Sequence, residues 1–279
     1  MTSHIDTLAA VASNYEAIVL DQWGVLHDGT TPYLGAISIL ESLVSSGTSL
    51  AVLSNSGKRG EPNANRISQM GFAIGMFETV MTSGEALWRN IDAGSIKEQS
   101  FFAIERSAGD AKAWADGLDL TLCESQNDAD AILLMGLPDG ATLEAWLPLL
   151  DKAKTTGQTI YCSNPDRASP RKGGQLVVSP GALAIAYKDM GGDVRFYGKP
   201  HLPIFRAVER ALGTSKLLMV GDSLEHDIAG AQHAGWDSCL VQGGLYAKDF
   251  ATGERADTLA RLVTEKGCKH PTYTLGELR

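Results

Sequence analysis

The sequence lacks a paired-cysteine motif and a long apolar segment, and we expect it to have no amino-terminal signal peptide. Its 4 cysteines are widely spaced and none forms Cys-x-x-Cys, which argues against a zinc ribbon or a redox pair. The longest apolar runs, such as residues 131–137, fall well short of the ~20 residues that a membrane-spanning helix needs. Residues 1–16 carry no basic segment followed by a long apolar stretch. We therefore predict a cytoplasmic protein that does not associate with a membrane.

Positive charge is also scarce in this chain. The 24 lysines and arginines are outnumbered by 33 aspartates and glutamates, which gives a formal net charge of -9. Because nucleic-acid backbones are bound mainly through lysine and arginine, this balance argues against a nucleic-acid partner. Apolar material, in contrast, is ample, since 44% of the 279 residues are hydrophobic. That is enough for one large or two modest domains.

Short apolar runs alternate along the chain with helix-like stretches. The predicted strands are residues 17–21, 49–53, 100–104, 131–135, 159–162, 194–197, 216–220 and 238–241. The predicted helices are residues 35–46, 62–70, 83–91, 142–156, 181–190, 202–211 and 224–234, with a short amphipathic helix within 4–13. This alternation predicts an α/β fold with a Rossmann-like, doubly wound parallel sheet covered by helices on both faces.

Polar residues follow several of the predicted strands. In parallel α/β sheets, ligands bind beyond the carboxyl ends of the strands, so these residues are expected to form one site. Four strand ends carry such residues, namely Asp21, Ser54 with Asn55, Lys199, and Asp222. The segment Asn164-Pro165-Asp166 follows a fifth predicted strand in the middle of the chain.

The residue types at these strand ends suit phosphate chemistry. A strand-end carboxylate such as Asp21 can act as a covalent nucleophile or as a metal ligand. The Ser54 hydroxyl and the following main-chain amides suit an anion. Lys199, held between glycine and proline, would neutralise the repulsion between Asp21 and an incoming phosphate. Asp222 and Asp227, five residues apart, supply the hard oxygen ligands that Mg²⁺ prefers.

In this order the four elements resemble the haloacid dehalogenase-like (HAD) superfamily. The matches extend over about 210 residues, from Asp21 to Gly230. The long segment between Ser54 and Lys199 resembles the inserted α/β cap of class IIA members, a group of sugar and nucleotide phosphatases, and residues 161–166 are similar to its Thr-Asn-Pro-Asp signature. The resemblance implies a core domain of residues 1–83 and 179–279, with a smaller inserted α/β cap domain of residues 84–178.

The resemblance also implies a role for each site residue. Asp21 would attack phosphorus and form an aspartyl-phosphate. The cofactor would be Mg²⁺, held by the Asp21 carboxylate, the Trp23 main-chain carbonyl and Asp222, with Asp227 acting directly or through water.

The substrate implied is a small phosphorylated metabolite. Its phosphate would be met by Lys199, the Ser54 hydroxyl and the Asn55 amide. Asn164 and Asp166 would close over the substrate or organise the cap loop. Class IIA relatives often pair through their caps, which makes a homodimer the implied assembly.

One position departs from the phosphatase pattern. Where relatives carry Asp-x-Asp-Gly, this chain has Asp21-Gln22-Trp23-Gly24. The missing aspartate is the general acid–base, whose loss costs about 10²–10⁴ in rate. We therefore expect aryl or acyl phosphates to be hydrolysed better than alkyl phosphates. His27 and Asp28 are the nearest alternative acids in the sequence.

The sequence is also compatible with two other functions. Haloacid dehalogenases also carry an aromatic residue at the position of Trp23, so a carbon–halogen hydrolase is conceivable, although Asp222 and Asp227 preserve a magnesium site that such a reaction does not require. The chain could also be a catalytically impaired, phosphometabolite-binding protein that kept the anion and metal sites without turnover.

Overall fold

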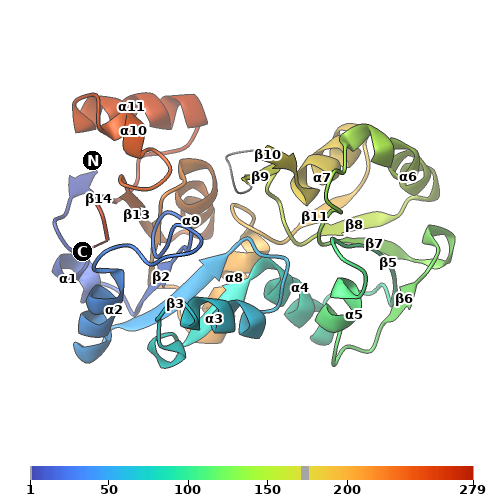
Figure 1. Ribbon diagram of the computed structural model, residues 1–279, viewed down its shortest axis with the longest axis horizontal. Coiled ribbons are helices and arrows are strands. Elements are labelled where there is room, and N and C mark those ends of the chain that lie inside the picture. The colour runs from blue at the N-terminus through green and yellow to red at the C-terminus, as the bar shows by residue number, and fades with distance from the viewer. Residues whose placement is uncertain (1, 171–175, 279) are drawn as a thin grey trace. The chain divides into compact units, whose positions relative to one another are not determined.

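The computed structural model of the chain describes residues 2–170 and 176–278 (Figure 1). Two compact units make up the chain, and each contains a parallel sheet of its own. The first unit comprises Met1–Ser54, Gly60–Met81 and Lys199–Arg279. The second unit comprises Asn55–Arg59 and Thr82–Gly198.

A seven-stranded sheet forms the centre of the first unit. Its strands, in spatial order, are β1 (Ser3–His4), β14 (Tyr273–Leu275), β13 (Asp237–Val241), β12 (Leu217–Gly221), β2 (Ala17–Leu20), β3 (Ser49–Ser54) and β4 (Thr79–Thr82). The neighbouring pairs from β1 to β3 are parallel. The chain proceeds outward from β2 to β4 on one side and from β12 to β14 on the other, so the strand order reverses between β2 and β12. Such a reversal is where doubly wound sheets bind ligands.

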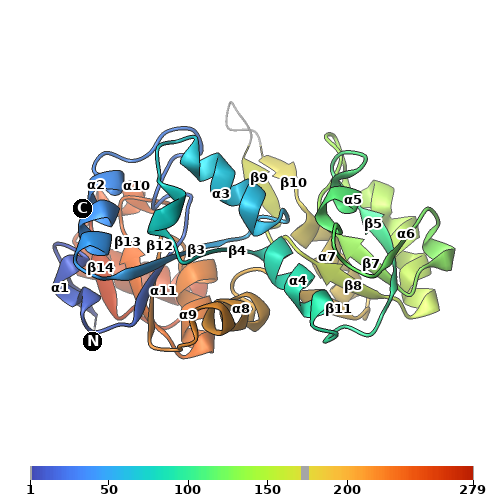
Figure 2. The ribbon, with the colours of Figure 1, turned by 90° about the horizontal axis from the view of Figure 1, so that it is seen from below.

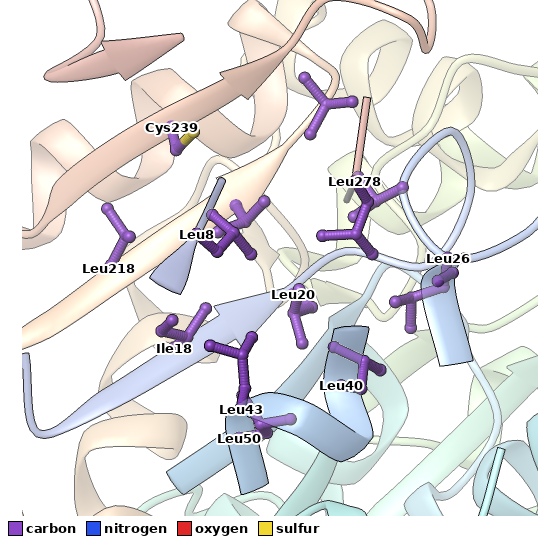
Figure 3. Close-up of a cluster of buried hydrophobic side chains, with 14 of the residues drawn as sticks. Leu8, Ile18, Leu20, Leu26, Leu40, Leu43, Leu50, Leu218, Cys239 and Leu278 are labelled. Atoms are coloured by element: carbon purple, nitrogen blue, oxygen red, sulfur yellow. The ribbon is translucent and has the colours of Figure 1, made fainter. Parts of the chain in front are cut away.

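Helices cover both faces of this sheet. They are α1 (Ala9–Ala12), α2 (Ala36–Ser45), α3 (Gly60–Ser68), η1 (Ile74–Met76), α8 (Leu202–Leu212), η3 (Leu224–Ile228), α9 (Ala229–Ala234), α10 (Ala247–Phe250) and α11 (Arg255–Lys266). Side chains alternate between the faces of a strand. Ile18 and Leu20 of β2 therefore share a face, where they pack with Leu40 and Leu43 of α2 (Figure 3).

The opposite face of the sheet packs against other helices. Leu240 of β13 lies in one cluster with Ile228 of η3 and Leu262 of α11. Figure 2 shows α8 and α9 side by side, and the Phe205 ring of α8 lies edge to face against Trp236, with the ring centroids 5.1 Å apart. The predicted doubly wound parallel fold is confirmed, and burial on both faces explains why β2 and β12 are continuously apolar.

The second unit is built on a five-stranded parallel sheet. Its order is β11 (Val194–Phe196), β8 (Thr159–Cys162), β7 (Ala131–Leu134), β5 (Ser100–Ile104) and β6 (Thr121–Cys123), and β9 (Ala168–Pro170) pairs with β10 (Leu176–Val178) in an antiparallel ribbon. The helices are α4 (Ser83–Asp92), α5 (Asp110–Trp114), η2 (Gln126–Asp128), α6 (Leu143–Thr156) and α7 (Pro180–Asp189). Leu150 of α6 and Leu183 of α7 pack with Ile132 of β7 and Ile160 of β8.

The boundary of the second unit differs from the prediction on its C-terminal side. It lies at Gly198 instead of residue 178, because β11 extends the sheet of this unit by pairing with β8. Leu183 of the preceding helix α7 belongs to the same apolar core. Whether the two units act as core and cap stays a prediction.

Two predicted helices also need correction. Residues 224–234 form a π-helical turn, η3, followed by α9, because the Ser223 carbonyl accepts from the N–H groups of both Asp227 and Ile228. Within residues 4–13 only Ala9–Ala12 is helical. The Ser3 and Ile5 N–H groups instead donate to carbonyls beside and within β14, which adds β1 to the sheet. Among residues 2–170 and 176–278, no helix has the length and apolar character needed to cross a membrane.

Candidate active site

Three carboxylates meet where the strand order of the first unit reverses. Asp21 follows β2 directly and Asp222 follows β12 directly. The two strands are neighbours and parallel, and the Asp21 N–H donates to the Val220 carbonyl at 2.9 Å. Both aspartates therefore lie at the same edge of the sheet, beyond the carboxyl ends of β2 and β12. With Asp227 of η3 they form a group in which one carboxylate oxygen from each residue lies within 4.8 Å of the others.

Lys199 lies inside this acidic group. Its Nζ is 2.7 Å from Asp21 Oδ1 and 2.7 Å from Asp227 Oδ1, and its side chain is only 4% exposed. The Leu53 carbonyl in β3 accepts from the same nitrogen at 3.5 Å. One ammonium cannot neutralise three carboxylates. The arrangement therefore suits a further cation bound through oxygen ligands, and a divalent metal ion meets that description. We name Asp21, Asp222, Asp227 and Lys199 the acid cluster.

Glycines and main-chain donors hold these carboxylates in place. Gly24 has a φ of +76°, and a Cβ at this position would overlap the Asp222 carboxylate. A Cβ on Gly221 would likewise overlap Asp227. The Leu245 N–H donates to Asp222 Oδ2 at 2.8 Å, and the Ser223 N–H donates to Asp227 Oδ2 at 3.0 Å. Close backbone approach and fixed donors pre-organise the oxygens of this site.

Burial and mutual repulsion shift the pKa values of this cluster. The pKa of Asp21 is raised to about 7, mainly by burial and also by the nearby Asp227 carboxylate, against the opposing effect of Lys199. Burial, followed by the charges of Asp21 and Asp227, raises the pKa of Asp222 to about 8. For Lys199, burial acts to lower the pKa, but the carboxylates of Asp21 and Asp227 outweigh it and hold the pKa above its ordinary value. A bound cation would relieve this crowding of negative charge.

These shifts predict how stability depends on pH without a divalent cation. Because the folded pKa values of Asp21 and Asp222 exceed the ordinary 3.8, these two groups bind more protons in the folded chain than in the unfolded chain between about pH 4 and pH 8, and together they outweigh the single proton that His27 loses on folding between about pH 4 and pH 6.5. The free energy of unfolding should therefore fall as pH rises through that window. Urea denaturation of EDTA-treated protein at several pH values measures this.

The same experiment with Mg²⁺ provides the comparison. Cations bind the ionised carboxylates, so Mg²⁺ should stabilise the protein more at pH 8 than at pH 5. Sodium chloride of equal ionic strength is the control. Equal stabilisation by Mg²⁺ at both pH values would contradict this assignment of the acid cluster.

The remaining predicted phosphate contacts divide between the two units. Ser54 ends β3 in the first unit and is partly buried. Asn55 belongs to the second unit, where its Nδ2 donates to Asp166 Oδ1 at 2.8 Å. Asn164 Oδ1 accepts from the Asp166 N–H at 3.1 Å. These bonds suit the predicted role of Asn164 and Asp166 in organising their loop, whereas their contact with a substrate stays a prediction.

Trp23 lies on the loop that follows Asp21. Its side chain is 49% exposed, and its ring lies edge to face against His27 with the ring centroids 6.2 Å apart. Gly29 has a φ of +104°, and a Cβ there would overlap the Trp23 ring. The loop thus holds the indole against a glycine and a buried histidine. This role of Gly29 was not predicted, although a glycine directly after His27-Asp28 is its signal in the sequence.

Neither nearby alternative has the pKa that a general acid requires near neutral pH. Burial lowers the pKa of His27 to about 4, and its Nδ1 accepts from the Gly29 N–H at 3.0 Å, which leaves the ring proton on Nε2. Asp28 accepts from the N–H groups of Thr31 and Thr30 and from the Thr30 hydroxyl, and these bonds hold its pKa below the ordinary value.

Two further residues, which were not predicted from the sequence, help to position the carboxylates of the acid cluster. The Gln22 side chain is buried and donates to Asn63 Oδ1 of α3, which ties the loop after Asp21 to that helix. A Cβ on Gly244 would overlap the Asp222 side chain. Gly244, in the loop after β13, therefore lets the main chain approach this carboxylate.

Comparison with known proteins agrees with this geometry. A family model described as haloacid dehalogenase-like hydrolase matches residues 18–113, and one described as HAD-hydrolase-like matches residues 196–265. The chain is 26% identical to the 5′-nucleotidase YutF of Bacillus subtilis, over 86% of this chain and 92% of that protein.

Two further similarities extend this result. A cardiolipin synthase/mitochondrial hydrolase fusion protein of Schizosaccharomyces pombe is 29% identical over 63% of this chain, and the match spans only 31% of that protein. The crystal structure of a haloacid dehalogenase-like hydrolase from Brucella suis superposes with a TM-score of 0.78 and 28% identity, covering 99% of this chain and 100% of that one. The predicted homodimer and cytoplasmic location stay predictions.

Proposed function

This chain belongs to the haloacid dehalogenase-like hydrolases, and we propose that it is a Mg²⁺-dependent phosphatase of a small phosphorylated metabolite that acts through an aspartyl-phosphate. The observation that carries the proposal is the position of Lys199. Its ammonium lies 2.7 Å from both Asp21 and Asp227 at the point where the strand order reverses. The similarity to a 5′-nucleotidase over most of both chains supports a phosphorylated substrate.

The chemistry begins at the Asp21 carboxylate. One of its oxygens attacks the phosphorus atom, and the bond from phosphorus to the leaving oxygen breaks as the acyl phosphate forms. Water then attacks the same phosphorus atom, which releases inorganic phosphate and restores Asp21. Lys199 offsets the repulsion between the carboxylate and the phosphate, and the Ser54 hydroxyl and the Asn55 amide are proposed as donors to phosphate oxygens.

The residues present fit a divalent cation. The carboxylates of Asp21, Asp222 and Asp227, with the main-chain carbonyl of Trp23, are the proposed ligands, and oxygen-only donor sets of this kind suit Mg²⁺. The raised pKa values of Asp21 and Asp222 fit as well, since a cation would stabilise their ionised forms. When bound, the ion would supply positive charge against the phosphate oxygens.

The proposal is tested by phosphate release in the presence of Mg²⁺. Para-nitrophenyl phosphate and a panel of nucleotides and sugar phosphates serve as substrates. EDTA should abolish turnover, and added Mg²⁺ should restore it. Halide release from 2-chloropropionate in the presence of EDTA would instead indicate a dehalogenase. Thermal stabilisation by phosphometabolites without any phosphate release would indicate the binding protein, and either result would overturn the proposed activity.

Trp23→Asp tests the missing acid–base. If the rest of the site is intact, this variant should hydrolyse alkyl phosphates faster, by up to the ~10²–10⁴-fold that a general acid contributes. Aryl phosphates should gain less, because their leaving oxygen needs no proton. The ratio of kcat/KM for glycerol 3-phosphate to that for para-nitrophenyl phosphate measures the difference. Trp23→Asn is the matched control, since it opens the same space without an acid, and an equal gain in Trp23→Asn would point to steric relief.

A further inference from the structure

Two exposed apolar side chains belong to the loops that surround the acid cluster. Trp23 is 49% exposed and Leu245 is 61% exposed, although the main chains of both loops pack against the buried Asp222. Isolated exposed apolar side chains are common on protein surfaces. These two, however, lie beside the groups proposed to carry the reaction. The mechanism above uses only the main-chain carbonyl of Trp23 and the main-chain N–H of Leu245, and it leaves both side chains without a role.

The two loops meet at the Asp222 carboxylate. Gly24, next to Trp23, approaches this carboxylate so closely that a Cβ would overlap it, and the same holds for Gly244, next to Leu245. A Cβ on Gly244 would also lie 2.7 Å from the Gly24 carbonyl oxygen, so the loops contact each other. The Leu245 N–H donates to Asp222 Oδ2 at 2.8 Å. Trp23 and Leu245 are therefore each one residue away from the contact between the loops.

The indole ring of Trp23 is fixed before any ligand binds. One part of the ring packs against Gly29 and the buried His27, and the rest is exposed. Arg66 of α3 in turn donates from Nη2 to the Gly29 carbonyl at 3.0 Å, which holds that glycine in place. An aromatic side chain that is already held in one orientation loses little conformational entropy when it binds a ligand. The exposed part of the ring is therefore a preorganised contact surface.

The position of the nucleophile determines which part of a substrate would meet this surface. Asp227 and Lys199 are buried, and the Asp21 side chain is only 14% exposed. In-line displacement places the leaving group on the side of the phosphorus atom that faces away from the attacking oxygen. Because Asp21 attacks from within a mostly buried cluster, the leaving group would point outward, toward the exposed side chains of the surrounding loops.

The chemistry of the two side chains favours one kind of leaving group. A leucine side chain forms no hydrogen bonds, and an indole ring offers a single donor. The hydroxyl groups of a sugar or polyol would exchange water for surfaces that cannot pair with them, which is unfavourable. An aromatic ring or an alkyl chain would instead remove apolar area from water on both sides of the contact.

We infer that the side chains of Trp23 and Leu245 contact the leaving group of the substrate and select a phosphate monoester whose leaving group is apolar, either aromatic or alkyl. The inference rests on the phosphatase activity proposed above and specifies its substrate class. It is separate from the missing acid–base at Trp23. That loss concerns the acidity of the leaving oxygen, whereas this contact depends on the apolar area of the group that carries it.

A series of n-alkyl phosphates separates the two effects. Ethyl, butyl and hexyl phosphate release alcohols of nearly equal acidity, so a trend along the series reports the apolar contact alone. Burial of a methylene group contributes up to roughly fourfold. We therefore expect kcat/KM of the wild type in Mg²⁺ to rise at least about tenfold from ethyl to hexyl phosphate, mainly through KM.

Leu245→Asn and Trp23→Asn should each reduce this rise at least about threefold. Leu245→Asn replaces the side chain by a polar one and keeps the main-chain N–H that binds Asp222. Val44→Asn is the matched control, because Val44 is also exposed and lies near the end of α2. α2 leads into the start of β3, which runs parallel to β2, so Val44 lies toward the edge of the sheet opposite to the acid cluster. This control should leave the rise unchanged.

Binding of ethylphosphonate and hexylphosphonate in the presence of Mg²⁺, measured by titration calorimetry, provides a readout without turnover, since their phosphorus–carbon bond is not hydrolysed. Hexylphosphonate should bind at least about tenfold more tightly to the wild type, and Leu245→Asn should remove most of this preference. Equal kcat/KM along the alkyl series, or a rise that both variants retain, would overturn the contact and leave the phosphatase activity standing. If no ester released phosphate, the proposed activity would fail, and equal binding of the two phosphonates would then overturn the contact as well.

Discussion

Asp21→Asn should reduce phosphate release by at least about 10³-fold, as loss of a covalent nucleophile does in other hydrolases. The asparagine amide cannot form the acyl phosphate, but its oxygen can still accept a hydrogen bond from Lys199, which lies 2.7 Å from the present carboxylate. The variant also removes one of three crowded carboxylates. We therefore expect it to fold and to be at least as stable as the wild type near pH 8.

Single-turnover phosphate release, together with urea denaturation, measures both parts of this prediction. Asp28→Asn is the matched control, because it makes the same change on the same loop at an exposed residue. It should have little effect on turnover, since Asp28 lacks the pKa of a general acid. Undiminished phosphate release by Asp21→Asn would exclude Asp21 as the nucleophile and with it the aspartyl-phosphate.

Lys199→Met should destabilise the protein by about 3–5 kcal/mol near pH 8 without Mg²⁺, the usual result of removing one partner from a buried ion pair. The methionine fills similar space, but the carboxylates of Asp21 and Asp227 lose their shared cation. The loss should be smaller near pH 5. There the raised pKa values of Asp21 and Asp222 allow these groups to bind protons, which removes charge from the cluster.

Urea denaturation at both pH values measures the effect, and added Mg²⁺ should recover part of the lost stability. Lys216→Met is the control, because Lys216 is exposed and pairs with no acid in the described part of the chain. If Lys199→Met were as stable as the wild type at pH 8, the ammonium would contribute nothing to holding the carboxylates. Turnover should fall as well, because Asp21 would no longer be shielded from an incoming phosphate.

Some features could be predicted from the sequence because they depend only on residues that are close together along the chain. A strand buried on both faces is continuously apolar. The apolar runs in the sequence therefore predicted β2 (Ala17–Leu20) and β12 (Leu217–Gly221). Parallel strands end at one edge of a sheet, so a polar residue after each apolar run pointed to one site. For Asp21 and Asp222 that reasoning was sufficient to place the two carboxylates together.

Other features depend on contacts between residues far apart in the sequence. The sequence alone determined the alternation of strands and helices, the acidic strand ends and the departure at Trp23, because each depends on neighbouring residues. Only the tertiary structure decided that β11 joins the second unit, that burial removes His27 as a proton donor near neutral pH, and that the buried Gln242 Oε1 has no hydrogen-bond partner among the described residues. Burial and hydrogen-bond pairing depend on contacts that form only when the chain is folded, so they cannot be predicted from neighbouring residues in the sequence.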